Sequence, residues 1–273
     1  MKTKEWTQLW HHTQLDVDLL HAHYVEHAFP RHTHEYYVIS LILRGRQSFS
    51  HRGVRYDTAP GGLILINPDE PHTGEAVDEA GYEMLCLYPT AAAMQHALAE
   101  LTGRPQGLPF FKETRVEAPG ESAQVAALHH ALTRATSPLE CESRFTWTLV
   151  QLVKRYADVR FQEPPPGRER KAVCEARRYM QERFDQEITL SQLAAHVGFS
   201  PYYFLRVFRA EVGMPPYSYL ESVRVTQAQQ LIKAGKSLAE TAVEAGFSSQ
   251  SHLTSRFKLI LGVTPGQYAQ QLK

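Results

Sequence analysis

The chain has 273 residues, of which 43% are hydrophobic, so it is long enough for two domains that each have a core. The formal net charge is zero, but residues 168–273 hold 14 lysines and arginines against 9 acidic residues, a net +5, and residues 1–167 carry the compensating −5. No apolar run approaches the roughly 18 residues of a membrane span, and the N-terminus lacks a signal-peptide pattern. The three cysteines are scattered and form no CxxC pair, which argues against a disulfide framework or a cysteine-based zinc site. We therefore expect a cytoplasmic protein.

Residues 1–90 carry the pattern of a β-rich domain. Short runs at 36–43, 63–66 and 82–88 are rich in Val, Ile, Leu and Tyr, and turn-forming Gly, Pro, Asn and Asp separate them. This spacing favours a β-sandwich or a small barrel. Residues 91–162 then change to helical periodicity, with apolar positions three and four apart at Val125, Leu128 and Leu132.

The segment 163–167 contains three prolines and a glycine. Consecutive prolines favour an extended, semi-rigid spacer. We therefore expect a linker here and a domain boundary between residues 162 and 168.

Residues 189–268 contain one helix-turn-helix pattern twice, with an offset of 48 residues up to a serine and 49 after it. A repeated pattern of this density indicates a repeated structural module. The matched positions are Leu190, Ala194, Gly198, Phe199, Ser200, Phe204, Phe208, Arg209, Gly213, Pro216 and Tyr219 in the first copy, and Leu238, Ala242, Gly246, Phe247, Ser248, Leu253, Phe257, Lys258, Gly262, Pro265 and Tyr268 in the second.

Each copy has the signals of two helices joined by a tight turn. Thr189-x-x-Gln192 and Ser237-x-x-Glu240 predict capping boxes at the start of a first helix. A glycine then allows the turn, and a serine is predicted to cap the second helix, Ser200 in one copy and Ser248 in the other. Phenylalanine and leucine side chains spaced i,i+4 on the second helices predict a core face.

Residues 217–234 predict a helix that connects the two copies, with Val225, Ala228, Leu231 and Ile232 on one face. At 1.5 Å per residue these positions span roughly 27 Å. That length approaches the ~34 Å between successive major-groove faces of B-DNA, so both second helices can face one side of a duplex.

These motifs, with Arg224 and Ala228 of the connecting helix and the Gly-x-x-Pro-x-x-Tyr endings, resemble the DNA-binding domain of AraC-type transcriptional regulators over residues 172–272. The register of His32-x-His34, Gly45, 60–61, 67–68 and His72 resembles the cupin-like effector-binding domain of the same family. The resemblance implies an α+β protein in which a cupin-like barrel with flanking helices precedes an all-α domain with two helix-turn-helix motifs.

The expected domains are an effector-binding barrel at 1–90, a helical segment at 91–162 that pairs two protomers, and a DNA-binding domain at 168–273. Transferred residue by residue, the family pattern places DNA contacts on the second helix of each motif. These positions are Tyr202, Tyr203, Leu205, Arg206 and Arg209 in the first copy, and Gln250, Ser251, His252, Thr254 and Ser255 in the second. Arginine can pair with a guanine edge, whereas Leu205 can only meet a thymine methyl group.

His32, His34 and His72 fall at the ligand positions of cupins, and three neutral imidazoles can bind a metal, line an organic pocket or make structural hydrogen bonds. A metal-binding cupin is also expected to supply a glutamate where Val38 and Ile39 stand here, and Glu35 would point to the opposite face of a strand. We therefore expect His32, His34, Tyr36 and His72 to bind an organic effector, with no metal and no cofactor.

The leading hypothesis is a ligand-responsive activator of bacterial promoters that binds double-stranded DNA and a small-molecule effector, acts as a homodimer and has RNA polymerase as a further partner. It is not expected to be an enzyme. The alternative from another class is a metal-dependent cupin enzyme with a DNA-binding appendage. A constitutive DNA binder whose barrel only dimerises is a third hypothesis.

Overall fold

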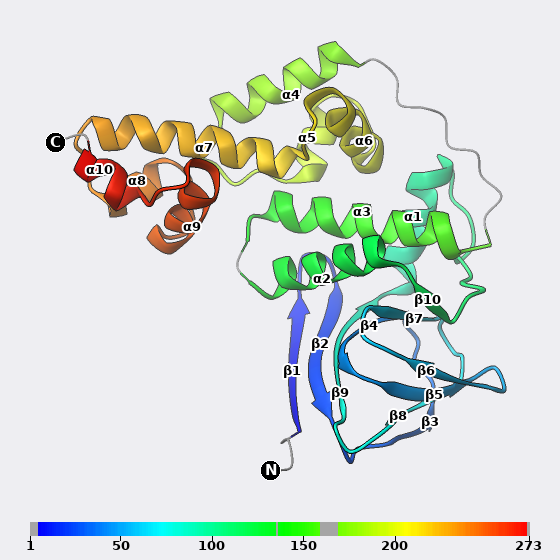
Figure 1. The fold of residues 1–273 in the computed structure, drawn as a ribbon. Helices are drawn as coiled ribbons and strands as arrows, with labels where there is room; N and C mark the ends of the chain where they lie inside the picture. Colours follow the sequence, from blue (N-terminus) through cyan, green and yellow to red (C-terminus); the bar gives the residue numbers. More distant parts are fainter. Residues whose placement is uncertain (1–4, 135, 159–168, 272–273) are drawn as a thin grey trace. The chain divides into compact units, whose positions relative to one another are not determined.

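The computed structural model describes residues 5–134, 136–158 and 169–271, and the predicted linker at 163–167 lies outside these ranges. The chain divides into two compact units, Met1–Arg134 with Arg144–Glu163, and Ala135–Ser143 with Pro164–Lys273. Figure 1 traces the strands of the first and the helices of the second. No helix in the described part of the chain is long and apolar enough to span a membrane.

Two antiparallel sheets form the first unit (Figure 1). The six-stranded sheet runs in the order β1 (Trp6–His12), β2 (Val17–Tyr24), β9 (Tyr82–Pro89), β4 (Val38–Gly45), β7 (Gly62–Ile66) and β10 (Arg115–Glu117). The four-stranded sheet runs in the order β3 (Phe29–His32), β8 (His72–Ala76), β5 (Gln47–His51) and β6 (Val54–Thr58). The predicted runs at 36–43, 63–66 and 82–88 correspond to β4, β7 and β9 within two residues.

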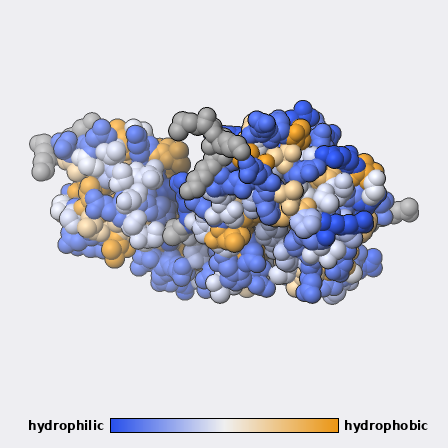
Figure 2. Space-filling view, turned by 90° about the horizontal axis from the view of Figure 1, so that it is seen from below, coloured by the Kyte–Doolittle hydropathy of each residue, from blue (hydrophilic) through white to orange (hydrophobic). Residues whose placement is uncertain are grey.

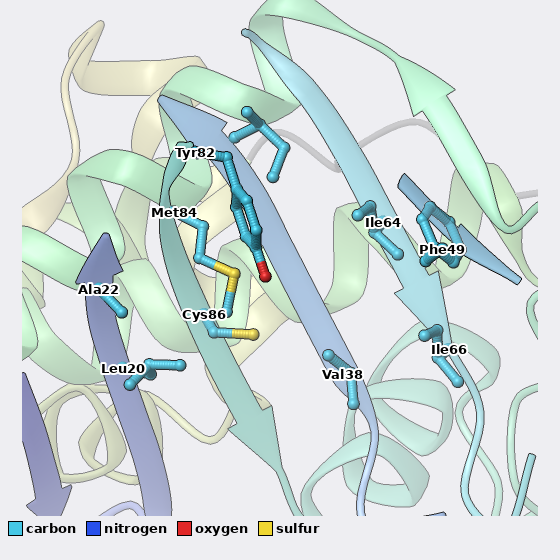
Figure 3. Packing of buried hydrophobic residues seen from close by; sticks show 10 residues of the cluster. Leu20, Ala22, Val38, Phe49, Ile64, Ile66, Tyr82, Met84 and Cys86 are labelled. Carbon is cyan, nitrogen blue, oxygen red and sulfur yellow. The ribbon is translucent and has the colours of Figure 1, made fainter. Parts of the chain in front are cut away.

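The core of this unit lies between the sheets. Strands β2, β4, β7 and β9 contribute apolar side chains from one sheet, and Phe49 of β5 meets them from the other (Figure 3). Alternation along each strand directs every second side chain inward. The buried cluster comprises Leu20, Ala22, Val38, Ile42, Phe49, Ile64, Ile66, Tyr82, Met84 and Cys86.

Three helices follow the strands: α1 (Ala91–Thr102), α2 (Pro119–Thr133) and α3 (Pro138–Tyr156). Helix α2 packs against the six-stranded sheet, where it contacts β1, β4, β7 and β9. Its His129 is buried, and the Nε2 of that ring lies 3.1 Å from the carbonyl oxygen of Leu20. Two adjacent histidines on a helix are most simply interpreted as surface groups, but at His129 strand β2 offers a carbonyl oxygen beneath the helix and the ring is buried. Strand β10, between α1 and α2, was not predicted.

The second unit is helical: α4 (Arg170–Glu182), α5 (Leu190–His196), α6 (Pro201–Val212), α7 (Pro216–Lys233), α8 (Leu238–Glu244), α9 (Gln250–Leu261) and α10 (Pro265–Gln271). Helices α5 and α6 form one helix-turn-helix motif, α8 and α9 form the other, and α7 connects them. The i,i+4 pairs on α6 and α9 are fully buried, as predicted, at Phe204, Phe208, Leu253 and Phe257. The fold class expected from the sequence is thereby confirmed.

Helix caps fix where these motifs begin. Both predicted capping boxes are present, at Thr189 with Gln192 and at Ser237 with Glu240. Ser200 caps α6 as predicted, but α9 is capped by Ser249 and not by Ser248. The extra residue that changes the repeat offset from 48 to 49 therefore lies in the turn before α9, and Ser248 instead contacts the His252 ring, Oγ to Nδ1, at 3.1 Å.

Candidate functional site

A cavity of about 570 Å³ lies in the first unit, between the two sheets. Its inner wall is apolar, with Leu20, Val38, Phe49 and Met84 among the lining residues. Its rim is polar and carries histidines, tyrosines and Asp18. A volume of this size and a lining of this kind suit a small organic molecule that is held by apolar contacts and oriented by a few polar groups.

The three predicted histidines meet at this cavity. His32 on β3 and His72 on β8 are direct partners in the strand register, and His34 follows β3 in the next turn. One ring nitrogen of each of the three lies within 4.8 Å of the others. His72 is buried, and His32 and His34 are half-buried. The structure therefore brings together three side chains that the sequence placed 2 and 40 residues apart.

The hydrogen bonds around the cluster orient two of its rings. The Nδ1 of His32 lies 2.7 Å from the carbonyl oxygen of Pro30, and the Nδ1 of His72 lies 2.9 Å from that of Glu70. A carbonyl oxygen only accepts, so Nδ1 is the donor in both rings, and a neutral ring in this orientation presents a lone pair at Nε2. The Nε2 of His32 lies 3.1 Å from the Nε2 of His34.

Burial favours the neutral form of two of the rings, His72 and His34. It lowers the pKa of His72 to about 4, against a small opposing effect of the Glu70 carbonyl. Burial, with the nearby His32 as a second cause, also lowers the pKa of His34. Neutral imidazole is the form that accepts hydrogen bonds or coordinates a cation.

Two tyrosines extend the rim. Tyr36 stacks on His34 with ring centroids 4.7 Å apart, and Tyr88 packs edge-on against Tyr36 at 5.1 Å. Burial raises the pKa of both phenols, so both keep their protons and can donate to a ligand. Tyr36 was predicted at this site, whereas Tyr88 was missed because a tyrosine inside an apolar run has no distinctive sequence signal.

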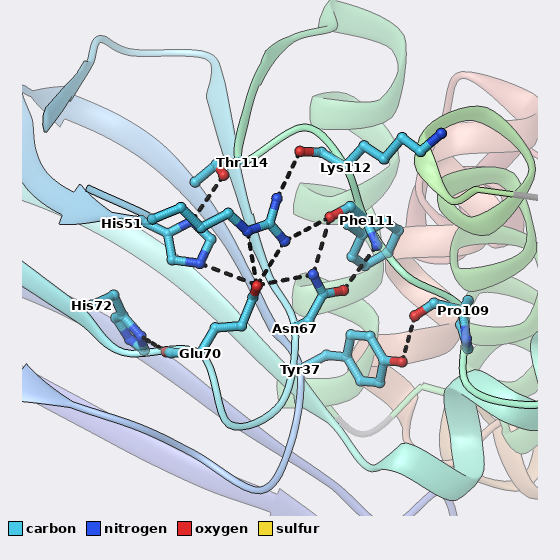
Figure 4. A network of polar contacts seen from close by, with 10 residues as sticks. Tyr37, His51, Asn67, Glu70, His72, Pro109, Phe111, Lys112 and Thr114 are labelled. Carbon is cyan, nitrogen blue, oxygen red and sulfur yellow. Dashed lines mark hydrogen bonds and ion pairs between the residues drawn. The ribbon is translucent and has the colours of Figure 1, made fainter. Parts of the chain in front are cut away.

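A polar network behind the cluster holds Glu70, and through it His72 (Figure 4). The Glu70 carboxylate accepts from Arg52 at 2.8 Å, Asn67 at 2.9 Å and His51 at 3.1 Å, while its backbone carbonyl accepts from His72. Burial opposes ionisation of Glu70, but the hydrogen bonds from Arg52 and Asn67 outweigh it and lower the carboxyl pKa. No local sequence signal marks this support, because its members come from two segments, residues 51–52 and 67–72, which the pairing of β5 with β8 brings together.

The predicted DNA-binding positions on α6 differ in exposure. Arg209 is exposed and Tyr203 and Arg206 are half-buried, but Tyr202 and Leu205 are 3% and 1% exposed. The expectation that Tyr202 and Leu205 face DNA is therefore corrected: the buried side of α6 extends to these two residues, and a covered side chain cannot reach a base edge.

On α9, Gln250, Ser251 and Ser255 are exposed, and His252 and Thr254 are half-buried. The Thr254 hydroxyl donates to the carbonyl oxygen of Gln250 at 2.9 Å. The sequence did not single out Arg256, which reaches from α9 to Glu221 of α7 at 2.8 Å and helps fix the helix. On the face drawn in Figure 2, hydrophilic residues predominate and hydrophobic ones form small separate patches.

Comparison with known proteins finds two family models along the chain. Residues 14–149 match the model described as an AraC-like ligand binding domain, and residues 193–271 match a helix-turn-helix domain. An HTH-type transcriptional regulator of Bacillus subtilis, YbfI, is 34% identical over 82% of this chain and 81% of its own length. The arabinose operon regulatory protein of Salmonella typhimurium is 24% identical over 85% of this chain and 83% of its own length.

Among solved structures, the C-terminal domain of AraT, a response regulator from Geobacillus stearothermophilus, is similar to part of the chain. It is 30% identical with a TM-score of 0.36, and the match covers 37% of this chain and 84% of that domain.

Proposed function

The chain belongs to the AraC family of transcriptional regulators, and from that membership we propose which of its residues bind the effector and the promoter. It is a ligand-responsive DNA-binding regulator and not an enzyme, which sets aside the metal-dependent cupin enzyme as an alternative.

We propose that the effector is a small organic molecule that occupies the cavity between the sheets. His32, His34, Tyr36 and His72 would orient it at the rim, and the apolar wall would cover its hydrophobic part. The single observation that supports this most is that the four residues converge on one 570 Å³ cavity inside the segment matched by the ligand-binding model. An effector acts only if it binds one arrangement of the domains more tightly than the other.

We propose that DNA is contacted by Tyr203, Arg206 and Arg209 of α6 and by Gln250, Ser251, His252, Thr254 and Ser255 of α9. Arg206 would contact a base edge and Arg209 a phosphate. The net +5 of residues 168–273 supports a surface that attracts the phosphate backbone.

Three further parts of the proposal follow from the family. The chain acts as a homodimer paired through the helical segment 91–162, activates transcription through contact with RNA polymerase, and works in the cytoplasm where the promoters are. The domain limits that we propose are 1–90, 91–162 and 168–273.

One experiment tests the core of the proposal. Full-length protein is used to select fragments of genomic DNA, a promoter so identified drives a reporter, and small molecules are then screened for an effect on its expression. The expected result is a response to one chemical class of compound that His34→Ala abolishes while the protein still binds the promoter. A reporter that responds to no compound, or equally in His34→Ala, would refute the proposed effector site.

A further inference from the structure

We propose that His32, His34 and His72 bind one divalent first-row transition-metal ion, zinc or a close neighbour, at the rim of the barrel cavity. This inference deepens the proposed effector site and rests on it: the ion would form part of the surface that the effector meets. It departs from the expectation drawn from the sequence, which assigned no metal.

The spacing of the ring nitrogens fits a shared ion. Two Zn–N bonds of about 2.1 Å at a tetrahedral angle place the nitrogens about 3.4 Å apart. The Nε2 atoms of His32 and His34 are 3.1 Å apart, and one nitrogen of each of the three rings lies within 4.8 Å of the others. An ion would draw nitrogens that lie at most 4.8 Å apart to about 3.4 Å, a small movement that falls mainly on the half-buried His34 ring.

The orientation of the rings supplies the second argument. His32 and His72 each direct Nδ1–H to a backbone carbonyl, the arrangement that fixes the tautomer and aim of metal-binding histidines. With Nδ1 as the donor, the Nε2 atoms of His32 and His72 are left as acceptors, and only the Nε2 of His34 can carry a proton toward them. A single proton can form a hydrogen bond to only one Nε2 lone pair, whereas one metal ion can be coordinated by the Nε2 atoms of all three histidines.

The rigidity of the surroundings is the third argument. The carbonyl that orients His72 belongs to Glu70, whose carboxylate is held by Arg52, Asn67 and His51. The register pairing of His32 with His72 fixes the distance between their strands at the same point. Two of the three ligands are thus held in place before any ion arrives, which reduces the entropy lost on binding.

The absence of a carboxylate at Val38 and Ile39 does not count against this site. Three imidazoles are a complete protein ligand set for an ion that keeps one position open for water or another oxygen ligand. All three histidines line the cavity, so the open position faces the space proposed for the effector.

The test uses untagged full-length protein, because a histidine tag would bind the same ions. All variants also carry Cys174→Ser, which removes an exposed thiol that binds such ions on its own. The protein is stripped with chelator and titrated with Co²⁺, whose visible absorption reports coordination, and Zn²⁺ is then added in competition. The expected result is one equivalent of Co²⁺ per chain, displaced by one equivalent of Zn²⁺.

His34→Ala and His72→Ala are each expected to weaken Co²⁺ binding at least about 100-fold, since removal of a ligand costs more than the 10- to 100-fold loss from removal of an outer partner. His96→Ala is the matched control, because this exposed histidine of α1 is outside the cavity, and it should bind as the parent does. Circular dichroism checks folding, and His34→Ala decides the test if the buried His72→Ala fails to fold.

A parent protein that binds no Co²⁺ at micromolar concentration, or a folded His34→Ala that binds it unchanged, would overturn the metal site. If the parent protein still gives a reporter response to an organic effector and His34→Ala does not, the proposed function stands after either result. If the parent protein binds one Co²⁺ per chain but its reporter responds to no compound, the proposed function is contradicted and the metal site is not.

Discussion

The Nε of Arg224 lies 2.7 Å from the carbonyl oxygen of Phe184, so the helix that connects the two helix-turn-helix motifs is pinned to the turn that follows α4. A second guanidinium nitrogen of Arg224 donates to the carbonyl oxygen of Gln186 at 2.8 Å. Arg224 is only 5% exposed. The cation therefore acts inside the protein, where it joins segments 40 residues apart, and its place in the family motif reflects folding and not DNA contact.

Replacement of Arg224 by methionine should lower the free energy of unfolding of the second unit by about 2 kcal/mol. Hydrogen bonds from charged donors contribute about 1.5–3 kcal/mol each, and water can replace part of this at the exposed Gln186. Urea unfolding followed by circular dichroism measures the loss, while Trp6, Trp10 and Trp147, all in the first unit, should report an unchanged fluorescence transition. Arg178→Met, an exposed α4 control, should change neither signal.

Gly246→Ala should destabilise the same unit more than Gly262→Ala does. Both glycines have positive φ, +75° and +79°, so alanine costs about 1–2 kcal/mol of backbone strain at either. At Gly246 the added Cβ would also lie 2.6 Å from the Phe184 carbonyl oxygen, whereas at Gly262 nothing lies within 4 Å. If both variants lose the same free energy of unfolding in thermal or urea experiments, the turn after α4 can move to make room for the added Cβ at little cost.

Arg206→Ala should cost roughly 1–3 kcal/mol in binding to the specific promoter site and should relax the preference at one or two base pairs. Arg209→Ala should weaken all sequences about equally, because phosphate contacts carry no sequence information. Binding titrations across a set of singly mutated sites separate the two patterns. If Arg206→Ala weakened all sequences equally and Arg209→Ala relaxed the sequence preference, α6 would face the DNA with a different side from the one proposed.

Promoter binding by the full-length protein should fall steeply with salt. Each phosphate that the basic unit neutralises releases counterions, so the logarithm of affinity should fall against the logarithm of salt concentration with a slope of about −0.9 per phosphate. Arg209→Ala should make this slope shallower by about 0.9, the contribution of one phosphate, whereas Arg178→Ala should leave the slope unchanged. A slope that is the same in both variants would remove Arg209 from the set of phosphate contacts.

The first unit should lose stability as the pH falls from about 6.5 to about 4. Burial lowers the pKa of His129 from 6.5 to about 4, with His21 and His130 adding smaller effects in the same direction, so the unfolded chain binds a proton in this window that the folded chain does not. Melting temperatures followed by tryptophan fluorescence should therefore drop across the window. His129→Gln should make the drop smaller without removing it, because the pKa of His72 in the same unit is also lowered to about 4, and the exposed His96→Gln should leave the drop unchanged.

Much of the helical unit was accessible from sequence because its signals are local. Capping boxes, i,i+4 apolar pairs and turn glycines depend on neighbours within four residues, and both capping boxes were found where predicted. One-residue errors remained, as at Ser249, where two adjacent serines compete to cap α9.

The barrel was harder to predict where contacts are distant along the chain. The histidine positions could be identified, but the support of His72 by Glu70, His51 and Arg52 depends on strand register, which no local pattern encodes. The burial of His129 depends on the position of α2 over the carbonyl oxygen of Leu20 in β2. The burial of Tyr202 and Leu205 depends on how other helices pack against α6.

The second helices of the two motifs, α6 and α9, differ in the side chains at several equivalent places. With the 49-residue offset, Arg206 corresponds to Ser255 and Tyr203 to His252, so the two helices differ at these places although Arg209 is matched in charge by Lys258. If both helices bind DNA as proposed, a DNA segment bound by one chain has two halves that cannot be exchanged, and reversing the segment would present each half to the wrong helix. Orientation relative to the transcription start becomes part of the information that the binding site carries.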